Sequence, residues 1–401
     1  MLTMPPTHTI VVREPMQLSI AATNAPTTWA WSLEGPDGGL QPLTGASSER
    51  PSFTPTEPGT WRVSVTAGND AGESSTSFPL VAVEGTVLPF EPSGVAHHRP
   101  THRLALGRDT PPSLEVFDVR SGQARSVPLM RVPLSVAFDP NGEHLVVGEV
   151  GQVEVVSLTG PTPGVVATWP LPQNASAIAL AVNSTLAYWA SDMQLVGWVE
   201  LSTGAGSTRL VNQTLDTVRL HPDPTRLYGV RSSFAEPVRF DLSLDGGALL
   251  TSGQSASPRF QSWCRSGWVA RDGTQLLTGC GSLYRLSARA TDDLLFGGQL
   301  PSGAYLGLDE TTDAGAFVTI NQALGGRSED IGSPLLLRFL RSTLQQVGVQ
   351  RLPSRLGALD GRLVGEHVFV DDTDTAHVLL VSGPGVPAAR TVWVRLPAGV
   401  P

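Results

Sequence analysis

The stretch VAFDPNGEHLVVG, residues 136–148, decides the fold, because it has the pattern of a strand, a turn and a second strand and the chain repeats it. Asp139-Pro140-Asn141-Gly142 has the residue types of a type I turn. We expect a three-residue hairpin loop with Gly142 in the left-handed conformation. The acidic and histidine side chains beside it are either a catalytic cluster or turn residues.

Copies of this stretch recur along the chain. Leu104, Leu145, Leu186 and Leu227 are each 41 residues apart, and each belongs to a similar strand–turn–strand pattern. The spacing then drifts, and three further copies follow with insertions. The seven predicted copies span residues 95–107, 136–148, 177–189, 218–230, 267–279, 305–320 and 356–370.

Each copy is followed by a third β-rich run and by one more short strand, such as VVATWPL at 165–171. Four strands in about 40 residues is the signature of a β-propeller blade. Residues 86–401 resemble the YVTN, lactonase-like and WD-repeat superfamily of seven-bladed propellers. The resemblance implies a closed ring, and either residues 86–90 add a strand to it or the C-terminal TVWVRLP closes it alone.

The first 85 residues have a different pattern. Phe53, Trp61, Val63 and Val65 alternate as in strands that face a sandwich core, and Asn69-Asp70-Ala71-Gly72 has turn residues. This stretch resembles a PKD or related immunoglobulin-like domain, in which an aromatic residue after Pro-Gly precedes an Asn-x-x-Gly turn. We therefore predict an all-β protein, with a PKD-type sandwich in residues 1–85 and a seven-bladed propeller in 86–401.

The composition excludes several classes of function. All 27 basic residues are Arg, so the chain has no lysine for a Schiff base or a P-loop. A net charge of −9 argues against nucleic acid as a partner. No apolar run reaches the roughly 20 residues of a membrane span, and no secretory signal is expected at the N-terminus.

The repeat argues for the turn interpretation of Asp139. By our alignment, the equivalent positions of other copies hold His98, His221 and Asp309. A position that holds an acid in one copy and a base in another is typical of a turn. A catalytic role shared by all copies would need the same residue type in each of them.

Two further clusters have the residue types of metal ligands. HHRPTH contains His97, His98 and His102, which could bind a transition metal, although a turn directs its side chains outward. VDDTDTAH contains Asp371, Asp372 and Asp374, whose carboxylates could bind Ca²⁺ in a loop; the alternative is a solvated turn. No cofactor is firmly indicated, and Ca²⁺ is the only candidate.

The only cysteines, Cys264 and Cys280, flank a predicted hairpin. A three-residue loop at Arg271-Asp272-Gly273 pairs Ala270 with Thr274 and sets Cys264 opposite Cys280, within disulfide distance. A two-residue loop at Asp272-Gly273 shifts the register by one and separates them, and two free thiols are the alternative. A disulfide would imply an oxidising compartment.

Propellers usually bind partners at the face that carries the loops between the second and third strands and between blades. No lipase, zinc-protease or nucleotide-binding motif is present. By our register, the side chains expected on this face are Arg108, Asp109, Glu149, Asp192, Glu236, Arg327, Glu329 and Asp330, with Asp371, Asp372 and Asp374 in a loop of the same face.

Two functions are consistent with this pattern. The first is a non-catalytic binding or structural protein of a bacterial surface or a virion, in which the propeller binds a protein or glycan and the PKD-type domain is a spacer or adhesion module. The domain types place it outside the cell or on its surface. The second is a lactonase-like hydrolase with a metal in the channel.

Overall fold

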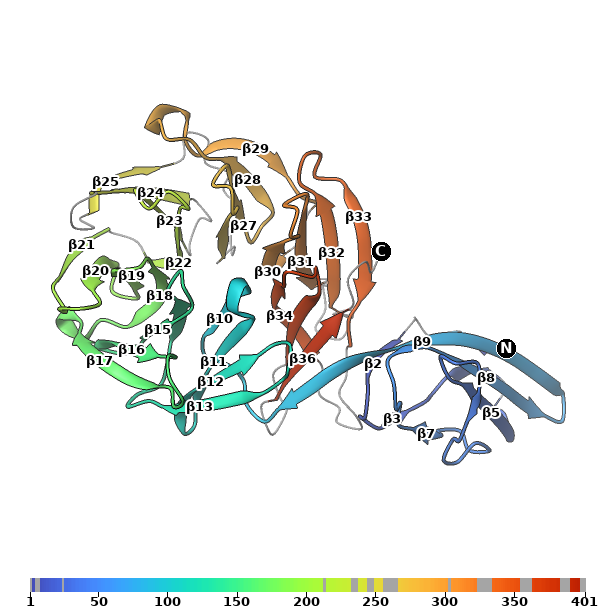
Figure 1. Cartoon of the computed structure of the whole chain (residues 1–401). Helices are drawn as coiled ribbons and strands as arrows, with labels where there is room; N and C mark the ends of the chain where they lie inside the picture. Colours follow the sequence, from blue (N-terminus) through green and yellow to red (C-terminus); the bar gives the residue numbers. More distant parts are fainter. Residues whose placement is uncertain are drawn as a thin grey trace.

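The computed structural model describes residues 2–3, 8–23, 25–211, 214–231, 237–243, 249–254, 266–301, 304–322, 334–353, 363–382 and 390–396. The all-β prediction is confirmed. In these residues the only helices are three short 3-10 turns, η1 (Arg99–Thr101), η2 (Pro172–Asn174) and η3 (Ala290–Asp292). Figure 1 shows a ring of sheets with a smaller domain attached at one side.

The smaller domain is a β-sandwich built on a hairpin. The turn at Asn69–Gly72 joins its two strands as predicted, and the side chain of Asn69 accepts a hydrogen bond of 2.9 Å from the backbone N–H of Ala71. Trp61 and Val63 alternate inward and are almost fully buried. The strands are β1 (Leu2–Thr3), β2 (His8–Val11), β3 (Met16–Gln17), β4 (Ala21–Ala22), β5 (Thr28–Glu34), β6 (Leu40–Gln41), β7 (Ser52–Phe53), β8 (Gly59–Asn69) and β9 (Gly72–Leu88).

Six antiparallel sheets of four strands follow in chain order, which confirms the propeller architecture. We number them from the first to the sixth sheet. Their strands are β10 (Val95–His98), β11 (Arg103–Asp109), β12 (Pro112–Asp118) and β13 (Ala124–Pro128); β14 (Ser135–Phe138), β15 (His144–Gly148), β16 (Gln152–Ser157) and β17 (Gly164–Pro170); β18 (Ala177–Val182), β19 (Leu186–Ser191), β20 (Leu195–Glu200) and β21 (Gly206–Leu210); β22 (Leu215–Leu220), β23 (Arg226–Arg231), β24 (Pro237–Leu242) and β25 (Leu249–Gln254); β26 (Gly267–Val269), β27 (Gln275–Thr278), β28 (Ser282–Arg285) and β29 (Leu295–Gln299); β30 (Ala304–Glu310), β31 (Ala316–Gln322), β32 (Leu335–Leu340) and β33 (Gln346–Arg351).

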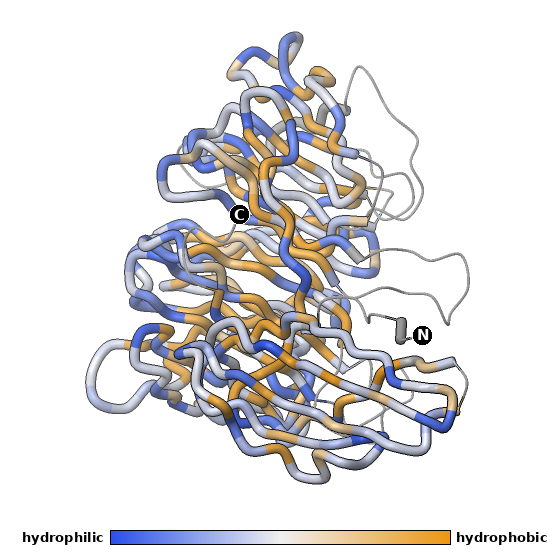
Figure 2. Tube along the Cα trace, turned by 90° about the vertical axis from the view of Figure 1, so that its right-hand side faces the viewer, coloured by the Kyte–Doolittle hydropathy of each residue, from blue (hydrophilic) through white to orange (hydrophobic). Residues whose placement is uncertain are grey.

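Three of the repeated leucines, Leu104, Leu145 and Leu227, occupy one position of the fold, whereas Leu186 lies one residue before that position, which Ala187 occupies because the turn at Asn183 is shorter. Leu104, Leu145, Leu186 and Leu227 lie on the second strands β11, β15, β19 and β23, and all four are buried. Their side chains belong to hydrophobic clusters that fill the space between one sheet and the next. Figure 2 shows the apolar segments running along the strands, with the hydrophilic segments mostly in the connections.

The last three strands, β34 (Leu363–Val370), β35 (Ala376–Ser382) and β36 (Thr391–Leu396), do not form a sheet of their own. Here the structure differs from the seven separate blades that we predicted. β36 pairs with the end of β9, from Glu84 to Leu88, inside one eight-stranded sheet that also contains β8, β5 and β6. We call β34–β36 with residues 84–88 the closing sheet. Of the two closures considered, the structure has the one that uses the segment after the first domain.

The last predicted repeat is displaced by one strand. The copy at 356–370 was expected to be a hairpin, but its described part is the single strand β34, and the hairpin turn lies at residues 371–375. Asp371 explains the position of the turn, because its carboxylate accepts backbone hydrogen bonds from Thr373 and Thr375. The drift of the leucine spacing did not reveal this turn.

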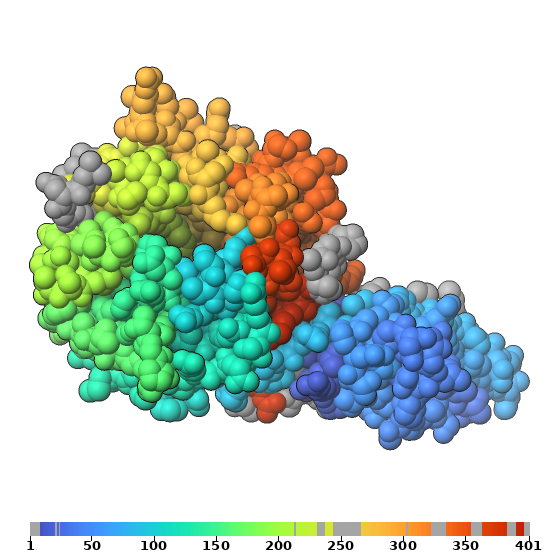
Figure 3. All heavy atoms as spheres, viewed as in Figure 1, coloured from blue at the N-terminus to red at the C-terminus, as the bar shows by residue number. Residues whose placement is uncertain are grey.

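The strand β9 belongs to both domains, since it pairs with β8 in the sandwich and with β36 in the closing sheet. The predicted boundary at residues 85 and 86 therefore falls inside a continuous strand. A second contact lies beside it, where the Thr9 hydroxyl donates a 2.6 Å hydrogen bond to the carbonyl of Arg351. Figure 3 shows the smaller domain projecting from the ring next to the last strands.

Candidate functional site: the two ends of the propeller channel

The first strand of each sheet lines the central channel, so its two ends define two faces of the ring. The turn face carries the turns between first and second strands, which are residues 99–102, 139–143, 183–185, 221–225, 270–274, 311–315 and 371–375. The loop face carries the loops between second and third strands and those between sheets. Its described loops include residues 110–111, 129–134, 149–151, 171–176, 192–194 and 279–281.

Asp139 is a turn residue, as the repeat argued. One carboxylate oxygen accepts hydrogen bonds from the backbone N–H groups of Glu143 (2.8 Å) and His144 (3.1 Å). The side chain is buried, and the hydrogen bonds that it accepts lie within the turn. The loop is one residue longer than predicted, because Asp139 pairs with His144 and its carboxylate holds the extra residue; Gly142 is left-handed as expected.

The equivalent turns use different side chains for the same task. The Asn183 side chain accepts from the N–H of Leu186, the Thr311 hydroxyl from that of Ala316 and the Asp371 carboxylate from that of Thr375. Asp309, which we aligned with this position, lies instead on β30. An acceptor at this position stabilises the turn, whatever its charge.

The three histidines of HHRPTH point to three different partners. His98 Nε2 donates to the carbonyl of Pro140 (3.1 Å) and so links the first sheet to the second. The His97 ring packs on Phe369, with 5.2 Å between ring centroids, and burial lowers the pKa of His97 to about 3. His102 lies 3.5 Å from Asp372. The three rings therefore do not converge on a common metal position.

The acidic turn at residues 371–375 lies on the turn face, which corrects its predicted placement among the partner-binding loops. Asp371 is buried in the turn and contacts His377 at 3.2 Å. Asp372 pairs with Arg120 of the first sheet at 2.8 Å. Asp374 accepts a 2.6 Å hydrogen bond from the N–H of Thr312 in the sixth sheet.

Asp372 and Asp374 thus tie the closing sheet to its two neighbours, while the Asp371 carboxylate stays within its own sheet, so the three carboxylates form no convergent Ca²⁺ ligand set at this turn. Within the described ranges, no group of three or more acidic, histidine or cysteine side chains is arranged to hold a metal ion.

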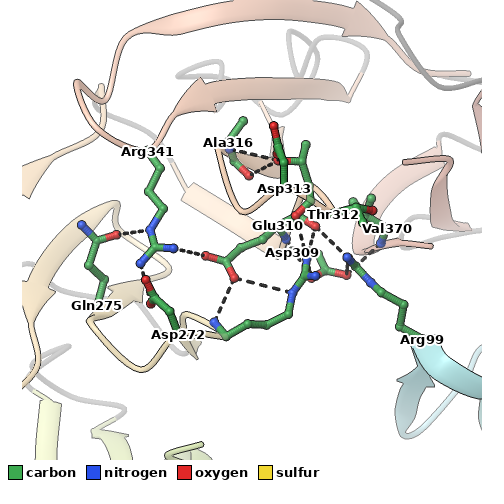
Figure 4. Close-up of polar contacts among 12 residues, drawn as sticks. Arg99, Asp272, Gln275, Asp309, Glu310, Thr312, Asp313, Ala316, Arg341 and Val370 are labelled. Carbon is green, nitrogen blue, oxygen red and sulfur yellow. Dashed lines mark hydrogen bonds and ion pairs between the residues drawn. The ribbon is translucent and has the colours of Figure 1, made fainter. Parts of the chain in front are cut away.

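The turn-face end of the channel is occupied by a network of ion pairs (Figure 4). The Glu310 carboxylate, almost fully buried, accepts a hydrogen bond from the N–H of Arg271 and lies 3.4 Å from the Arg341 guanidinium. Arg341 also reaches Asp272 at 2.6 Å and Gln275 at 2.7 Å. Burial raises the pKa of Glu310, and both guanidiniums oppose the rise.

A second part of the network joins sheets that are far apart in the sequence. Arg99, after β10, donates to the carbonyl of Glu310 (2.7 Å) and pairs with Asp309 (3.3 Å). Asp309 also accepts a hydrogen bond from the N–H of Val370 in the closing sheet. The network therefore connects the first, fifth, sixth and closing sheets, and most of its polar atoms have partners.

The loop-face end of the channel is open. A cavity of about 270 Å³ lies among the first halves of the strands that line the channel. Its polar lining includes Ser135, Asp216, Thr217, Arg219, Glu366 and His367.

Some of these groups have no hydrogen-bond partner among the described residues, and the same is true of single atoms of Glu310 and Arg99 at the other end. The hydroxyl of Thr217 and one carboxyl oxygen of Glu366 are buried without a hydrogen-bond partner. Burial and the nearby Glu91 raise the pKa of Glu366 to about 7. Burial, with a smaller contribution from Arg219, lowers the pKa of His367 to about 4. At neutral pH the His367 ring is therefore uncharged.

The structure places the predicted partner-binding residues in three situations. Arg108 is partly buried over the ring of Phe90, while Asp109 and Asp192 are exposed at the loop face. Glu149 lies in a loop of the same face, but its side chain is completely buried and does not reach the surface. The remaining predicted residues, Glu236, Arg327, Glu329 and Asp330, lie outside the described residues.

Glu149 forms a buried acidic pair with Glu154. The side-chain amide of Gln152 donates to both, at 2.6 Å and 3.1 Å, and one oxygen of each carboxyl group has no partner. Burial and the charge of Glu154 raise the pKa of Glu149 to about 7. Glu149 is thus neutral or charged depending on pH near neutrality.

The predicted disulfide remains a prediction, because Cys264 lies outside the described residues. The hairpin register that we used for it is wrong by one residue. Gly267 pairs with Thr278 and Ala270 with Gln275, since the loop has four residues, as at Asp139. Gly273 is left-handed, as expected.

Sequence reasoning missed Thr217, Arg219, Glu366 and His367, although a signal was present. They lie in apolar strands, LDTVRL and LVGEHVFV, where a charged residue has to face either a partner or an opening.

Comparison with known proteins agrees with the two-domain fold. The PKD domain family matches residues 1–82. The β-propeller domain of Cps50 (Swd1) from Myceliophteria thermophila has a similar structure, with a TM-score of 0.55 and 11% sequence identity over 76% of this chain and 96% of that one. At this identity the likeness concerns the fold alone. No curated protein matches the chain. The described residues contain no helix long and apolar enough to cross a bilayer.

Proposed function

We propose that the chain is a non-catalytic binding or structural protein whose propeller binds a protein or glycan partner at the loop face. The PKD domain is then a spacer or adhesion module, outside the cell or on its surface. The observation that carries this proposal is an asymmetry between the faces. Among the propeller turns and loops that the structure describes, the exposed large hydrophobic side chains all lie on the loop face: Met130, Val132, Val150 and Met193.

Exposed apolar side chains beside polar ones are typical of partner-binding surfaces. Met130 and Val132 flank Arg131, whose guanidinium donates to the carbonyl of Val150, so these residues form one patch. The exposed acids Asp109 and Asp192 belong to neighbouring loops of the same face. The turn face, by contrast, consists mostly of paired charges that already have partners.

We also propose that the closing sheet is the seventh blade of the ring. In support, one hydrophobic cluster joins it to the sixth sheet and another joins it to the first. A ring closed in this way presents a continuous loop face to a partner.

The test compares substitutions on the two faces. We expect Met130→Asp and Met193→Asp to abolish binding in a glycan array and in cross-linking to the native cell surface, without a change in melting temperature. The control, Arg120→Asp on the turn face, should leave binding intact. Binding that survives both methionine substitutions would contradict the proposal. Turnover of a lactone together with a stoichiometric metal would favour the hydrolase.

A further inference from the structure

Arg219, on β22, has an environment unlike that of the other arginines in the channel. Its only hydrogen bond within the described ranges goes to the carbonyl of Val218, at 3.1 Å. No carboxylate of the described residues forms an ion pair with it, whereas Arg99, Arg271 and Arg341 at the turn face all have carboxylate partners. Arg219 is partly buried, and this burial lowers the pKa of its guanidinium. A buried guanidinium without a counterion is unfavourable, so a bound anion would stabilise it.

The groups around Arg219 also support a binding site for a ligand. Arg219, Thr217 and Glu366 line one cavity, and the last two each have a buried oxygen atom without a partner. Arg219 contributes to the low pKa of His367, so the guanidinium of the fourth sheet acts across the channel on the closing sheet. A ligand in the cavity would therefore contact both sides of the channel.

The charges limit the ligand to a single negative charge. Besides Arg219, the charged or titratable groups near Glu366 are Glu91, His367 and Asp216. His367 is neutral above about pH 5, and the acids repel further negative charge. One guanidinium among several carboxyl groups suits a carboxylate and disfavours a phosphate dianion.

We propose that this cavity binds a small carboxylate, free or carried by a partner, through the Arg219 guanidinium, with the Thr217 hydroxyl and the Glu366 carboxyl group as further hydrogen-bonding groups. The proposal rests on the function proposed above and names the chemistry that the loop face recognises. Glu366 donates a hydrogen bond to the ligand only when it is protonated.

This last condition gives the site a pH dependence. The pKa of Glu366 is about 7, so at pH 6 about nine-tenths of the protein carries the neutral form and at pH 8 about one-tenth. The apparent dissociation constant rises as the competent fraction falls. We therefore expect binding to weaken about tenfold between pH 6 and pH 8.

The experiment uses saturation-transfer NMR on the full chain with three probes. These are sodium propionate, N-acetyl-glutamate amide as a side-chain carboxylate, and propionamide as the neutral control. We expect the carboxylates to bind and propionamide not to bind. Arg219→Gln should abolish binding, while Arg125→Gln, an exposed arginine of β13, should not. Glu366→Gln should remove the pH dependence and keep the binding.

Equal binding of propionate by the wild type and Arg219→Gln would overturn the proposal, as would a wild-type affinity that does not change between pH 6 and pH 8. If Arg219→Gln does not fold, the pH profile of Glu366→Gln decides. Glutamate amide binding without propionate binding would identify a partner's side chain as the source. If no carboxylate binds while Met130→Asp still abolishes partner binding, this inference fails and the proposed function stands.

Discussion

The two ends of the propeller channel are built from the same residue types and differ in whether the charges are paired. At the turn face, Glu310 and Asp309 lie among Arg99 of the first sheet, Arg271 of the fifth and Arg341 of their own sheet (Figure 4). At the loop face, Arg219 has no carboxylate partner in the described part of the chain. One buried oxygen of Glu366 has no hydrogen-bond partner there, with the His367 ring 3.9 Å away. The turn-face arrangement holds sheets together, and the loop-face arrangement leaves polar groups that can hydrogen-bond to a ligand.

The difference shows that a charged cluster in a propeller channel is not in itself a sign of a binding site. Removing one partner of a buried ion pair leaves the other charge uncompensated and lowers the free energy of unfolding. A charge that was never paired within the chain costs stability instead, and its retention is better explained by a ligand. Substitutions at the two ends should therefore affect stability with opposite signs.

The largest effect should come from the turn face. Arg341→Leu removes the guanidinium that contacts Glu310, Asp272 and Gln275, and leaves the nearly buried Glu310 carboxylate with Arg271 as its remaining cationic neighbour. We expect a loss of about 3–5 kcal/mol in the free energy of unfolding, measured by urea denaturation. Arg125→Leu, at an exposed position, serves as the control and should change it by less than about 0.5 kcal/mol. An equal effect of both substitutions would mean that the network does not support the ring.

A substitution at the loop face should instead raise the free energy of unfolding. Glu149 is buried there beside Glu154. The folded pKa of Glu149 is about 7, above its ordinary value of 4.5, so the folded state holds the proton more tightly. Stability should then fall as pH rises from about 4.5 to about 7. Glu149→Gln keeps the acceptor for Gln152 and cannot ionise, so it should stabilise the protein by about 2 kcal/mol at pH 8.

The same variant should show little difference from the wild type at pH 5, where both side chains are neutral. Urea denaturation at the two pH values measures this directly. If Glu149→Gln is destabilised equally at both, then the carboxylate makes a favourable contact and the contrast between the two faces is weaker than we infer.

The smallest effect concerns the exposed pair that links the closing sheet to the first. Arg120 and Asp372 are 2.8 Å apart, and their side chains are 58% and 43% exposed. Because solvent screens such pairs, Arg120→Leu should cost less than about 1 kcal/mol, and 0.5 M NaCl should remove the difference in thermal unfolding. A larger loss would show that ring closure depends on this contact.

The sequence was sufficient to predict much of the architecture, because turn residues and leucines recur at a regular spacing. It predicted the sandwich core around Trp61 and the turn role of Asp139, both of which the structure confirms. It failed where side chains decide the register. The Asp139 and Ala270 loops are each one residue longer than predicted, and the turn of the last hairpin lies at Asp371, beyond the predicted copy.

The candidate site was less predictable for a physical reason. Arg219 and Glu366 come from strands of the fourth and closing sheets, far apart in sequence, and only closure of the ring brings them to one cavity. Glu149 was expected to contact a partner because it lies in a loop, but the loop folds it inward. Neither the burial of a loop residue nor a contact across the channel can be derived from local pattern.

The strand β9 has a consequence for the order in which the protein can be made. Its first half can pair with β8 as soon as the sandwich leaves the ribosome, but its last residues, Glu84–Leu88, wait for Thr391–Arg395 at the other end of the chain. During that interval these residues form an unpaired strand edge, which is open to pairing with other chains. The two segments that pair to close the ring are thus synthesised at different times, and a nascent chain is most prone to aggregate at this edge until both are present.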